Sequence, residues 1–313
     1  MKRSCLLTLL FTALAAQAAP DALLFCRGER AWYLPADATT PEPLVDEDPG
    51  WVYEQPTWVD YERVAVMRLK GGEALRSHVG LVEQVGHLPI KPDEVGWIKS
   101  AGGALGIGSC PDYAKLAYTK VSYGKEDSFE PFLSVGPVDG QMGKPRSLGV
   151  NETGDVGGPR ARIRFAPDGN RAVVPSFPSD VSATVTLWDV AKNRDDDPYW
   201  LRWSWLTENG GDGAVSCIGW LRGGRILLGT LTSGLYQVDT KTKTITKIDT
   251  WEMGKASVTE LSVSADRTRA YYSVTTYGDN GESASEIRLL DANGKTSTVL
   301  KNASSPDARP AAG

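Results

Sequence analysis

The chain has 313 residues, of which 41% are hydrophobic and 23% are charged, and this is enough apolar sequence for one large domain or two ordinary ones. Wholesale disorder, a collagen-like repeat and a disulfide scaffold are excluded, because the apolar content is ordinary and only four residues are cysteine. The net charge of −5 disfavours nucleic acid and anionic lipid as partners. Two histidines in the whole chain leave little for a histidine-based metal or acid–base site.

The first eighteen residues have the features of a secretory signal peptide. Lys2 and Arg3 precede an apolar run over 6–16, and the small-x-small pattern that signal peptidase recognises follows at once. We expect cleavage between Ala18 and Ala19. The apolar run is shorter than the roughly 20 residues that cross a bilayer, and no later segment approaches that length. The sequence therefore predicts an exported protein, periplasmic or secreted, without a membrane span.

One short pattern recurs along the rest of the chain: an apolar strand, a tight polar turn, a basic residue and then at least three apolar residues. Six copies are visible, with their basic residues at Arg30, Arg63, Lys115, Arg171, Arg225 and Arg269. The intervals are 33, 52, 56, 54 and 44 positions, and all but the first are close to one four-stranded propeller blade. The short first interval predicts a first blade that is either short or shares strands with the C-terminus.

The turn chemistry explains this pattern. In Pro167-Asp168-Gly169, proline fixes φ, the aspartate bonds its own backbone and the glycine accepts a positive φ, so the three residues close a tight hairpin. The β-branched and aromatic runs that follow each turn are typical of strands. The turn residues that we single out are Pro111, Asp112, Pro167, Asp168, Gly169, Gly223, Gly224 and Asp266.

Each repeat supplies two hairpins, and therefore one four-stranded antiparallel sheet. Such sheets bury both faces when they stack radially around an axis, and radial closure leaves only short, protected edges. The sequence predicts an all-β fold, a six-bladed β-propeller over 19–302, with seven blades as the alternative. The residues 303–313 are expected to form a C-terminal tail that could help to close the ring.

The segment Phe165–Val174, FAPDGNRAVV, resembles the repeat of the TolB-type propellers, which also occurs in the propeller domains of prolyl-oligopeptidase-like peptidases. CPDYAKLAYT and SADRTRAYYS are weaker copies, and Trp188-Asp189 is similar to the dipeptide of WD-type (WD40-like) repeats. The resemblance implies a propeller over about 21–302. It covers the propeller only, without the α/β domain that precedes it in TolB and without a hydrolase domain.

No motif identifies catalytic residues. The G-x-S-x-G pattern of serine hydrolases is absent from the sequence, and Ser122 and Lys125 fit S-x-x-K without its partner motifs. His78 and His87 flank an expected strand over 79–85, which separates them too widely for one metal ion. Neither H-E-x-x-H nor a pair of C-x-x-C motifs is present, so no zinc site is predicted.

Two local clusters have both a functional and a plain structural interpretation. The carboxylates of 195–197 could offer oxygens to Ca²⁺. Aspartate is also common in hairpin turns, and we favour a turn without a bound ion as the interpretation here. Trp200, Trp203 and Trp205 could form a platform for a partner. Because both faces of a propeller blade are covered, we favour burial between neighbouring blades for these three.

Three cysteines remain after removal of the signal peptide, namely Cys26, Cys110 and Cys217. The repeat assignment places them in the first, third and fifth blades. A disulfide needs Cα atoms within about 7 Å, which blades that are not neighbours do not provide. We therefore predict no disulfide and three small, apolar, buried thiols.

These observations favour an exported binding module or scaffold that engages a protein or peptide partner in the cell envelope, through the loops at one end of its channel. The alternative is a metal-dependent hydrolase or lyase with its site in the central channel, where scattered Asp, Glu and Asn side chains could hold Ca²⁺. No catalytic, cofactor-binding or metal-binding residue can be assigned from the sequence.

Overall fold

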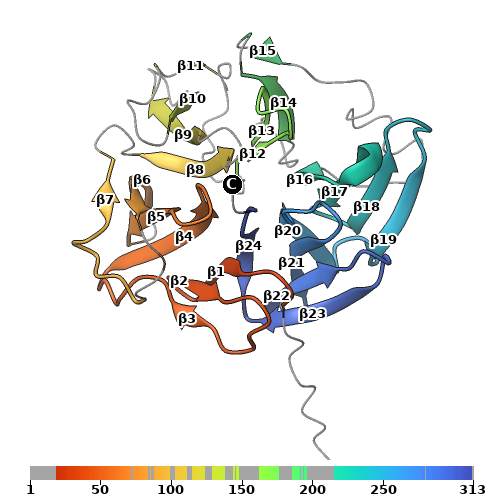
Figure 1. Ribbon diagram of the computed structural model, residues 1–313, viewed down its shortest axis with the longest axis horizontal. Coiled ribbons are helices and arrows are strands. Elements are labelled where there is room, and N and C mark those ends of the chain that lie inside the picture. Colours follow the sequence, from red (N-terminus) through yellow and green to blue (C-terminus); the bar gives the residue numbers. More distant parts are fainter. Residues whose placement is uncertain are drawn as a thin grey trace, which may run out of the picture.

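The structure, a computed structural model, describes residues 19–71, 73–83, 85, 88–98, 103–110, 115–123, 129–137, 144, 146–147, 162–175, 185–190, 192, 194–195, 215–278 and 280–311. The strands of these residues form four-stranded antiparallel sheets that are arranged radially around a central axis (Figure 1). Each sheet runs from an innermost strand at the axis to an outermost strand at the rim.

The first sheet contains, from the axis outward, β24 (Ser304–Ala308), β1 (Leu23–Arg27), β2 (Arg30–Leu34) and β3 (Glu42–Pro43). The second contains β4 (Trp51–Trp58), β5 (Val64–Lys70), β6 (Glu73–Val82) and β7 (Gly96–Trp97). The third contains β8 (Ala104–Cys110), β9 (Lys115–Tyr123), β10 (Phe129–Pro137) and β11 (Arg146–Ser147).

The fourth sheet contains β12 (Arg164–Phe165), β13 (Arg171–Pro175), β14 (Val185–Asp189) and β15 (Arg194–Asp195). The fifth contains β16 (Val215–Trp220), β17 (Arg225–Thr230), β18 (Gly234–Asp239) and β19 (Ile245–Thr250), and a short 3₁₀ turn, η4 (Arg222–Gly224), joins its first two strands. The sixth contains β20 (Ala256–Val263), β21 (Ala270–Tyr277), β22 (Ser283–Leu290) and β23 (Thr296–Lys301).

The recurring basic residue has the same place in five of these sheets. It is the first residue of the second strand at Lys115, Arg171 and Arg225, and it directly precedes that strand at Arg63 and Arg269. Arg30 also follows a hairpin, but it begins β2, which is the third strand from the axis. The first copy of the pattern is therefore not equivalent to the others, which explains the short first interval.

The all-β propeller is confirmed, but the number of blades predicted from the repeats, six with seven as the alternative, is wrong. Within the described residues, five blades are each one continuous segment that carries the pattern at its inner hairpin. The remaining sheet is a composite of β24 and β1–β3, which come from opposite ends of the described chain. Counting turn patterns treated this composite as a further repeat, because a hairpin between other strands uses the same turn chemistry.

Strand β24 closes the ring by pairing antiparallel with β1. Leu23 lies opposite Ala308 and Leu24 opposite Asp307, and the register then shifts so that Cys26 lies opposite Ser304. A positive φ of 56° at Ser305 accompanies this irregularity. The segment 303–313, expected from the sequence to be a tail, thus contains the innermost strand of the first sheet (Figure 1).

Apolar clusters fill the spaces between neighbouring sheets all the way around the ring. Tyr271 packs with Leu23 between the sixth and first sheets, and Val173 packs with Ile218 between the fourth and fifth. Inner strands approach closely where a side chain is missing: a Cβ at Gly108 would lie 2.0 Å from the carbonyl oxygen of Ile163. Burial on both faces explains why the second strands β5 and β17 are almost continuously apolar.

The three described cysteines are buried and none of them is in a disulfide, as the sequence predicts. Burial is the main cause that raises the pKa of the Cys26 and Cys217 thiols to about 12. Within the part of the chain that the structure describes, no helix is long and apolar enough to cross a membrane.

We predict that these thiols are inert in the native protein, since the thiolate is the reactive form. Purified protein cleaved after Ala18 should show almost no reaction with Ellman's reagent at pH 8, and three thiols per chain should react in guanidinium chloride. A count of one thiol in the denaturant under non-reducing conditions would contradict both the absence of a disulfide and the placement of the sheets.

Candidate functional site

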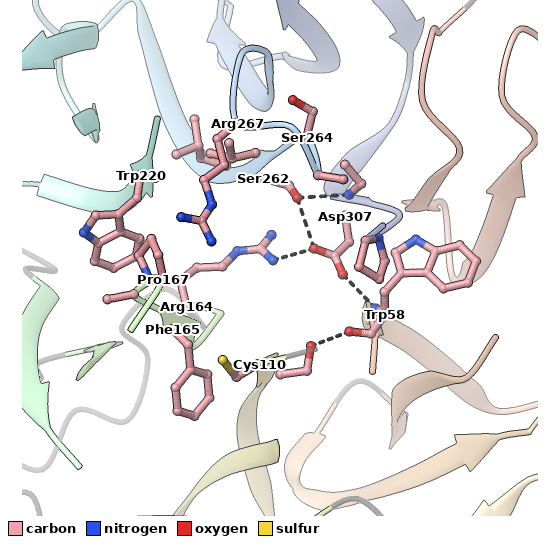
Figure 2. A pocket seen from close by; sticks show the side chains of 18 of the residues that line it. Trp58, Cys110, Arg164, Phe165, Pro167, Trp220, Ser262, Ser264, Arg267 and Asp307 are labelled. Atoms are coloured by element: carbon pink, nitrogen blue, oxygen red, sulfur yellow. Dashed lines mark hydrogen bonds and ion pairs between the residues drawn. The ribbon is translucent and has the colours of Figure 1, made fainter. Parts of the chain in front are cut away.

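A pocket lies at the mouth of the central channel, where the innermost strands end (Figure 2). Its volume is about 190 Å³. The last residue of every innermost strand contributes to its lining, namely Trp58, Cys110, Phe165, Trp220, Val263 and Ala308. The pocket is therefore built by the whole ring rather than by one blade, on the face that carries the inner hairpins.

The lining is mixed polar and apolar, with Trp58, Phe165 and Trp220 as its aromatic members. Its charged members are Arg164, Arg267 and Asp307. Two arginines and one carboxylate give the lining an excess positive charge, although the chain as a whole has a net charge of −5.

Asp307 is buried and fully engaged by hydrogen bonds. Its Oδ2 accepts a bond of 2.7 Å from the backbone N–H of Trp58, and its Oδ1 accepts one of 3.2 Å from the hydroxyl of Ser262. Nη1 of Arg164 forms a close ion pair with Oδ1 (Figure 2). These partners come from β4, β20 and β12, so one carboxylate on the closing strand β24 connects four inner strands.

Arg162, two residues before β12, contacts inner strands on the other sides of the channel. Its Nη2 donates to the carbonyl of Ser305 at 3.0 Å, its Nη1 to the hydroxyl of Thr57 at 2.8 Å, and its Nε to Glu260 at 3.3 Å. A second, longer ion pair of 3.7 Å joins Arg162 to Asp307. Arg162 thus connects the fourth sheet to the first, second and sixth across the axis.

Burial is the main cause that shifts the pKa values of Glu260 and Arg164. Loss of hydration raises the pKa of the Glu260 carboxyl, and the nearby Arg162 and Arg164 partly oppose that change. Loss of hydration also lowers the pKa of Arg164, which Asp307 opposes. A negative charge at Glu54 further raises the pKa of Glu260. These opposed effects are typical of buried charges that must be paired to be tolerated.

The rim of the pocket includes the residues that follow β24. Arg309 donates from its backbone N–H to the carbonyl of Ala22 at 2.9 Å and from Nε to the carbonyl of Tyr61 at 2.8 Å. Its guanidinium stacks on the Tyr61 ring at 3.8 Å. These contacts fix the chain so that Pro310 and Ala311 border the pocket.

The predicted turn residues lie around this same mouth. Oδ1 of Asp168 accepts hydrogen bonds from the backbone N–H groups of Asn170, at 2.9 Å, and Arg171, at 3.2 Å, and its Oδ2 binds the Arg171 side chain. Asp266 binds Thr268 in a similar way. Pro167 also borders the pocket.

The glycines of these turns have the positive φ values that such turns need, 63° at Gly169, 75° at Gly223 and 79° at Gly224. Pro111 and Asp112 lie outside the described residues.

The other predicted positions lie away from the pocket lining or outside the described chain. His78 lies between Trp51 and Trp97, with ring centroids 5.3 and 6.4 Å away, and burial is the main cause that lowers its pKa. Ser122 lies in β9 and Asp195 in β15. Residues outside the description are Ala18, His87, Lys125, Asp196, Asp197, Trp200, Trp203 and Trp205.

Among the described residues, no three His, Cys, Asp or Glu side chains are grouped closely enough to hold a metal ion. Glu260 and Asp307 are already bound by arginine side chains. A divalent cation at the axis would have to displace those arginines.

Sequence reasoning missed the charged residues of the channel. One signal was present: Arg162 and Arg164 alternate with apolar residues in the segment RIRF, which puts both on one face of an extended chain. Their partners Glu260 and Asp307 lie far away in the sequence, so the pairing could not be read from any local pattern.

Comparison with one solved structure shows the same fold. TolB from Acinetobacter baumannii matches with a TM-score of 0.61 at 17% identity, over 93% of this chain and 67% of that one. The β-propeller domain of the Trilobed protease from Pyrococcus furiosus matches with a TM-score of 0.42 at 12% identity, over 79% of this chain and 71% of that one. No protein-family model and no curated protein sequence matches the chain. The chain therefore has a TolB-like propeller fold, as the FAPDGNRAVV repeat predicts.

We predict that Asp307→Asn destabilises the protein by about 3 kcal/mol, because it leaves the buried guanidinium of Arg164 without its charge partner. The measurement is the free energy of unfolding in urea.

The matched control is Glu47→Gln, which removes the carboxylate of an exposed ion pair with Arg30 at 3.4 Å. The Glu47 side chain is 83% exposed, so this change should cost less than about 0.5 kcal/mol. Equal stability of the two variants would show that the axial ion pair does not hold the ring.

Proposed function

We propose that this chain is an exported binding module that engages a protein or peptide partner of the cell envelope through the pocket at its channel mouth. The observation that carries the proposal is the pocket itself, to which all innermost strands contribute. A concave, mostly apolar site with a few convergent polar groups is the usual form of a ligand site.

The rim gives the pocket the features of a protein-binding surface. Tyr61 is 41% exposed at the rim and stacks on Arg309. Trp220 and Phe165 line the adjoining pocket wall. Tyrosine, tryptophan and arginine are the residues that contribute most often to protein–protein binding energy. The TolB-like fold supports a scaffold of this kind, although the likeness concerns the fold alone.

Export is proposed from the N-terminal sequence. Lys2, Arg3 and the apolar run up to residue 16 precede the expected cleavage site. Ala19 is buried, and its carbonyl accepts a hydrogen bond of 2.7 Å from the N–H of Asp37, so the residue at the expected mature N-terminus is part of the packed fold. Edman sequencing of protein purified from the periplasm or the medium should begin at Ala19.

The geometry favours binding over metal-dependent hydrolysis. Among the described residues, Asp307, which lines the pocket, and Glu260 are paired with Arg164 and Arg162. The oxygens of these two carboxylates, which a divalent cation would need, thus already bind guanidinium groups.

We predict that Tyr61→Ala reduces recovery of the partner at least fivefold when tagged protein is captured from a mildly crosslinked envelope extract and bound proteins are quantified by mass spectrometry. The reason is the loss of an exposed aromatic side chain at the rim.

Tyr277→Ala is the control. Tyr277 is 43% exposed, and it lies beside the start of β20, whereas the pocket is at the end of that strand. A partner that both variants recover equally well would place the interface elsewhere. Stoichiometric Ca²⁺ or Zn²⁺ in the purified protein, with no partner recovered, would overturn the proposal in favour of a metal-dependent activity.

A further inference from the structure

The inner hairpin of the fifth sheet lacks the carboxylate that accompanies the recurring arginine elsewhere. In three of the described inner hairpins an aspartate stands three residues before that arginine, and the two side chains form an ion pair: Asp60–Arg63 at 2.6 Å, Asp168–Arg171 at 2.7 Å and Asp266–Arg269 at 3.8 Å. In the fifth sheet the recurring residue is Arg225, and the residue three positions before it is Arg222. This hairpin therefore has two like charges where the others have a neutral pair.

Arg225 keeps its side chain beside the backbone of Arg222. Its Nε donates a hydrogen bond of 3.2 Å to the carbonyl of Arg222. The N–H of Arg222 in turn donates to the carbonyl of Arg267 at 3.0 Å, which ties this turn to the inner hairpin of the sixth sheet. Because two positive charges in one turn repel each other, the exchange of aspartate for arginine does not stabilise the hairpin.

The outer hairpin of the same sheet, between β18 and β19, adds two lysines. Thr240 joins the two hairpins, because its N–H donates to the carbonyl of Gly224 at 3.0 Å. The Cε of Lys241 lies 3.8 Å from the position that a Cβ on Gly224 would take. Lys243 lies in the same connection between the strands. Both hairpins are on the face that carries the channel mouth, since β16 and β18 end there.

We call these four residues, Arg222, Arg225, Lys241 and Lys243, the basic surface. Arg225 is half-buried and the other three are exposed. Within the residues that the structure describes, none of the four forms an ion pair. Their positive charge is therefore available to a partner.

The two carboxylates of the fifth sheet have other partners. Oδ1 of Asp239 accepts hydrogen bonds from the backbone N–H groups of Lys241, at 2.8 Å, and Thr242, at 3.0 Å. Asp249 forms an ion pair of 2.8 Å with Arg288 of the sixth sheet. The residues 215–250 contain five basic and two acidic residues, in a chain whose net charge is −5. The fifth blade is thus a local positive region on a negative molecule.

We propose that the basic surface binds an acidic segment of a protein partner, next to the pocket. Trp220 lines the pocket (Figure 2) and stands two residues before Arg222, so a chain that enters the pocket can continue over the basic surface. Complementary charge of this kind speeds encounter and fixes orientation. The inference rests on the proposed function, and it extends that binding site to the fifth blade and names the chemistry of the partner.

An anionic membrane has the same charge as an acidic segment, but the molecule as a whole opposes its approach. A bilayer faces one entire side of the protein, and the net charge of −5 disfavours that contact. A short peptide segment is sensitive only to charges within a Debye length, which is about 8 Å at physiological ionic strength. The local positive charge therefore favours the peptide.

The probes are two peptides, Ac-Leu-Glu-Ala-Glu-Ala-Glu-Ala-NH₂ and the same peptide with glutamine in place of each glutamate, titrated calorimetrically into the protein cleaved after Ala18. We expect the acidic peptide to bind about tenfold more tightly at about 20 mM ionic strength. The preference should fall to about twofold at about 500 mM salt, because salt screens exposed charges.

Arg222→Asp gives this hairpin the residue that three others have. The new carboxylate can pair with Arg225, so this variant should melt at the same temperature as the parent or higher. Its preference for the acidic peptide should nevertheless fall about fivefold. Arg222→Gln, which adds no carboxylate, should lose part of the preference.

Lys301→Asp is the matched control, because it changes the net charge by the same amount. Lys301 is exposed at the end of β23, on the face opposite to the channel mouth. This variant should keep the preference within about twofold, since its charge lies farther from the basic surface than a Debye length.

The proposal is overturned if both peptides bind the parent equally well, or if Arg222→Asp and Lys301→Asp lose the preference equally. Vesicles of phosphatidylglycerol and phosphatidylcholine in equal parts are the membrane arm, and the protein should not sediment with them. Sedimentation that depends on Arg222, without a preference for the acidic peptide, would overturn the peptide in favour of a membrane surface.

The proposed function fails or stands separately. A partner whose capture depends on Tyr61 but not on Arg222 would leave the binding module standing and remove the basic surface from it. A peptide preference that depends on Arg222, with capture that Tyr61→Ala does not change, would place the interface on the fifth blade and remove the rim from it.

Discussion

The ring depends on one guanidinium that bridges its axis. Arg162 starts from the fourth sheet and contacts the first, second and sixth, through Ser305, Thr57 and Glu260. A buried arginine is tolerated only where its charge is paired and its donors are used. The groups that satisfy it lie on three different inner strands, β4, β20 and β24, so the cluster can form only when the sheets are assembled around the channel. The polar contacts of Arg162 thus favour the closed ring over other arrangements of the sheets. Most of the buried apolar surface lies in the clusters between neighbouring sheets.

Strand β24 both closes the ring and contributes to the pocket. Asp307 lies on β24, where its backbone pairs with β1 and its carboxylate binds Arg164 and borders the pocket. Any ligand in the pocket therefore contacts a strand that is held in the ring by a short, irregular ladder and by ion pairs. Since a ligand that binds only the closed ring stabilises it by mass action, binding and closure are thermodynamically linked. The position of the pocket at the C-terminal strand follows from this architecture.

The sequence predicted what is local and failed at what is not. Turn chemistry such as that of Asp168 and Gly169 depends on a few neighbouring residues, and it located the hairpins and the propeller class. Whether a hairpin joins the first two strands of a blade or the next two is not encoded in the turn, so Arg30 was counted as one more equivalent repeat. The axial pairs could not be found in this way, because Arg164 and Asp307 are 143 positions apart.

Repeats also identify a site through the places where they differ. Most of the turn around the channel mouth is the same in SADRTR and APDGNR, because the aspartate, the reversed backbone and the basic residue after it all serve the hairpin. The position after the aspartate is different: it is Gly169 in one turn and Arg267 in the other, and it faces the mouth of the channel. The backbone at this position is the same in both turns, with φ of 57° at Arg267 and 63° at Gly169, so the hairpin forms with either residue. Repeats of this kind therefore share what the hairpin needs, and they differ in the side chain that they present at the channel mouth.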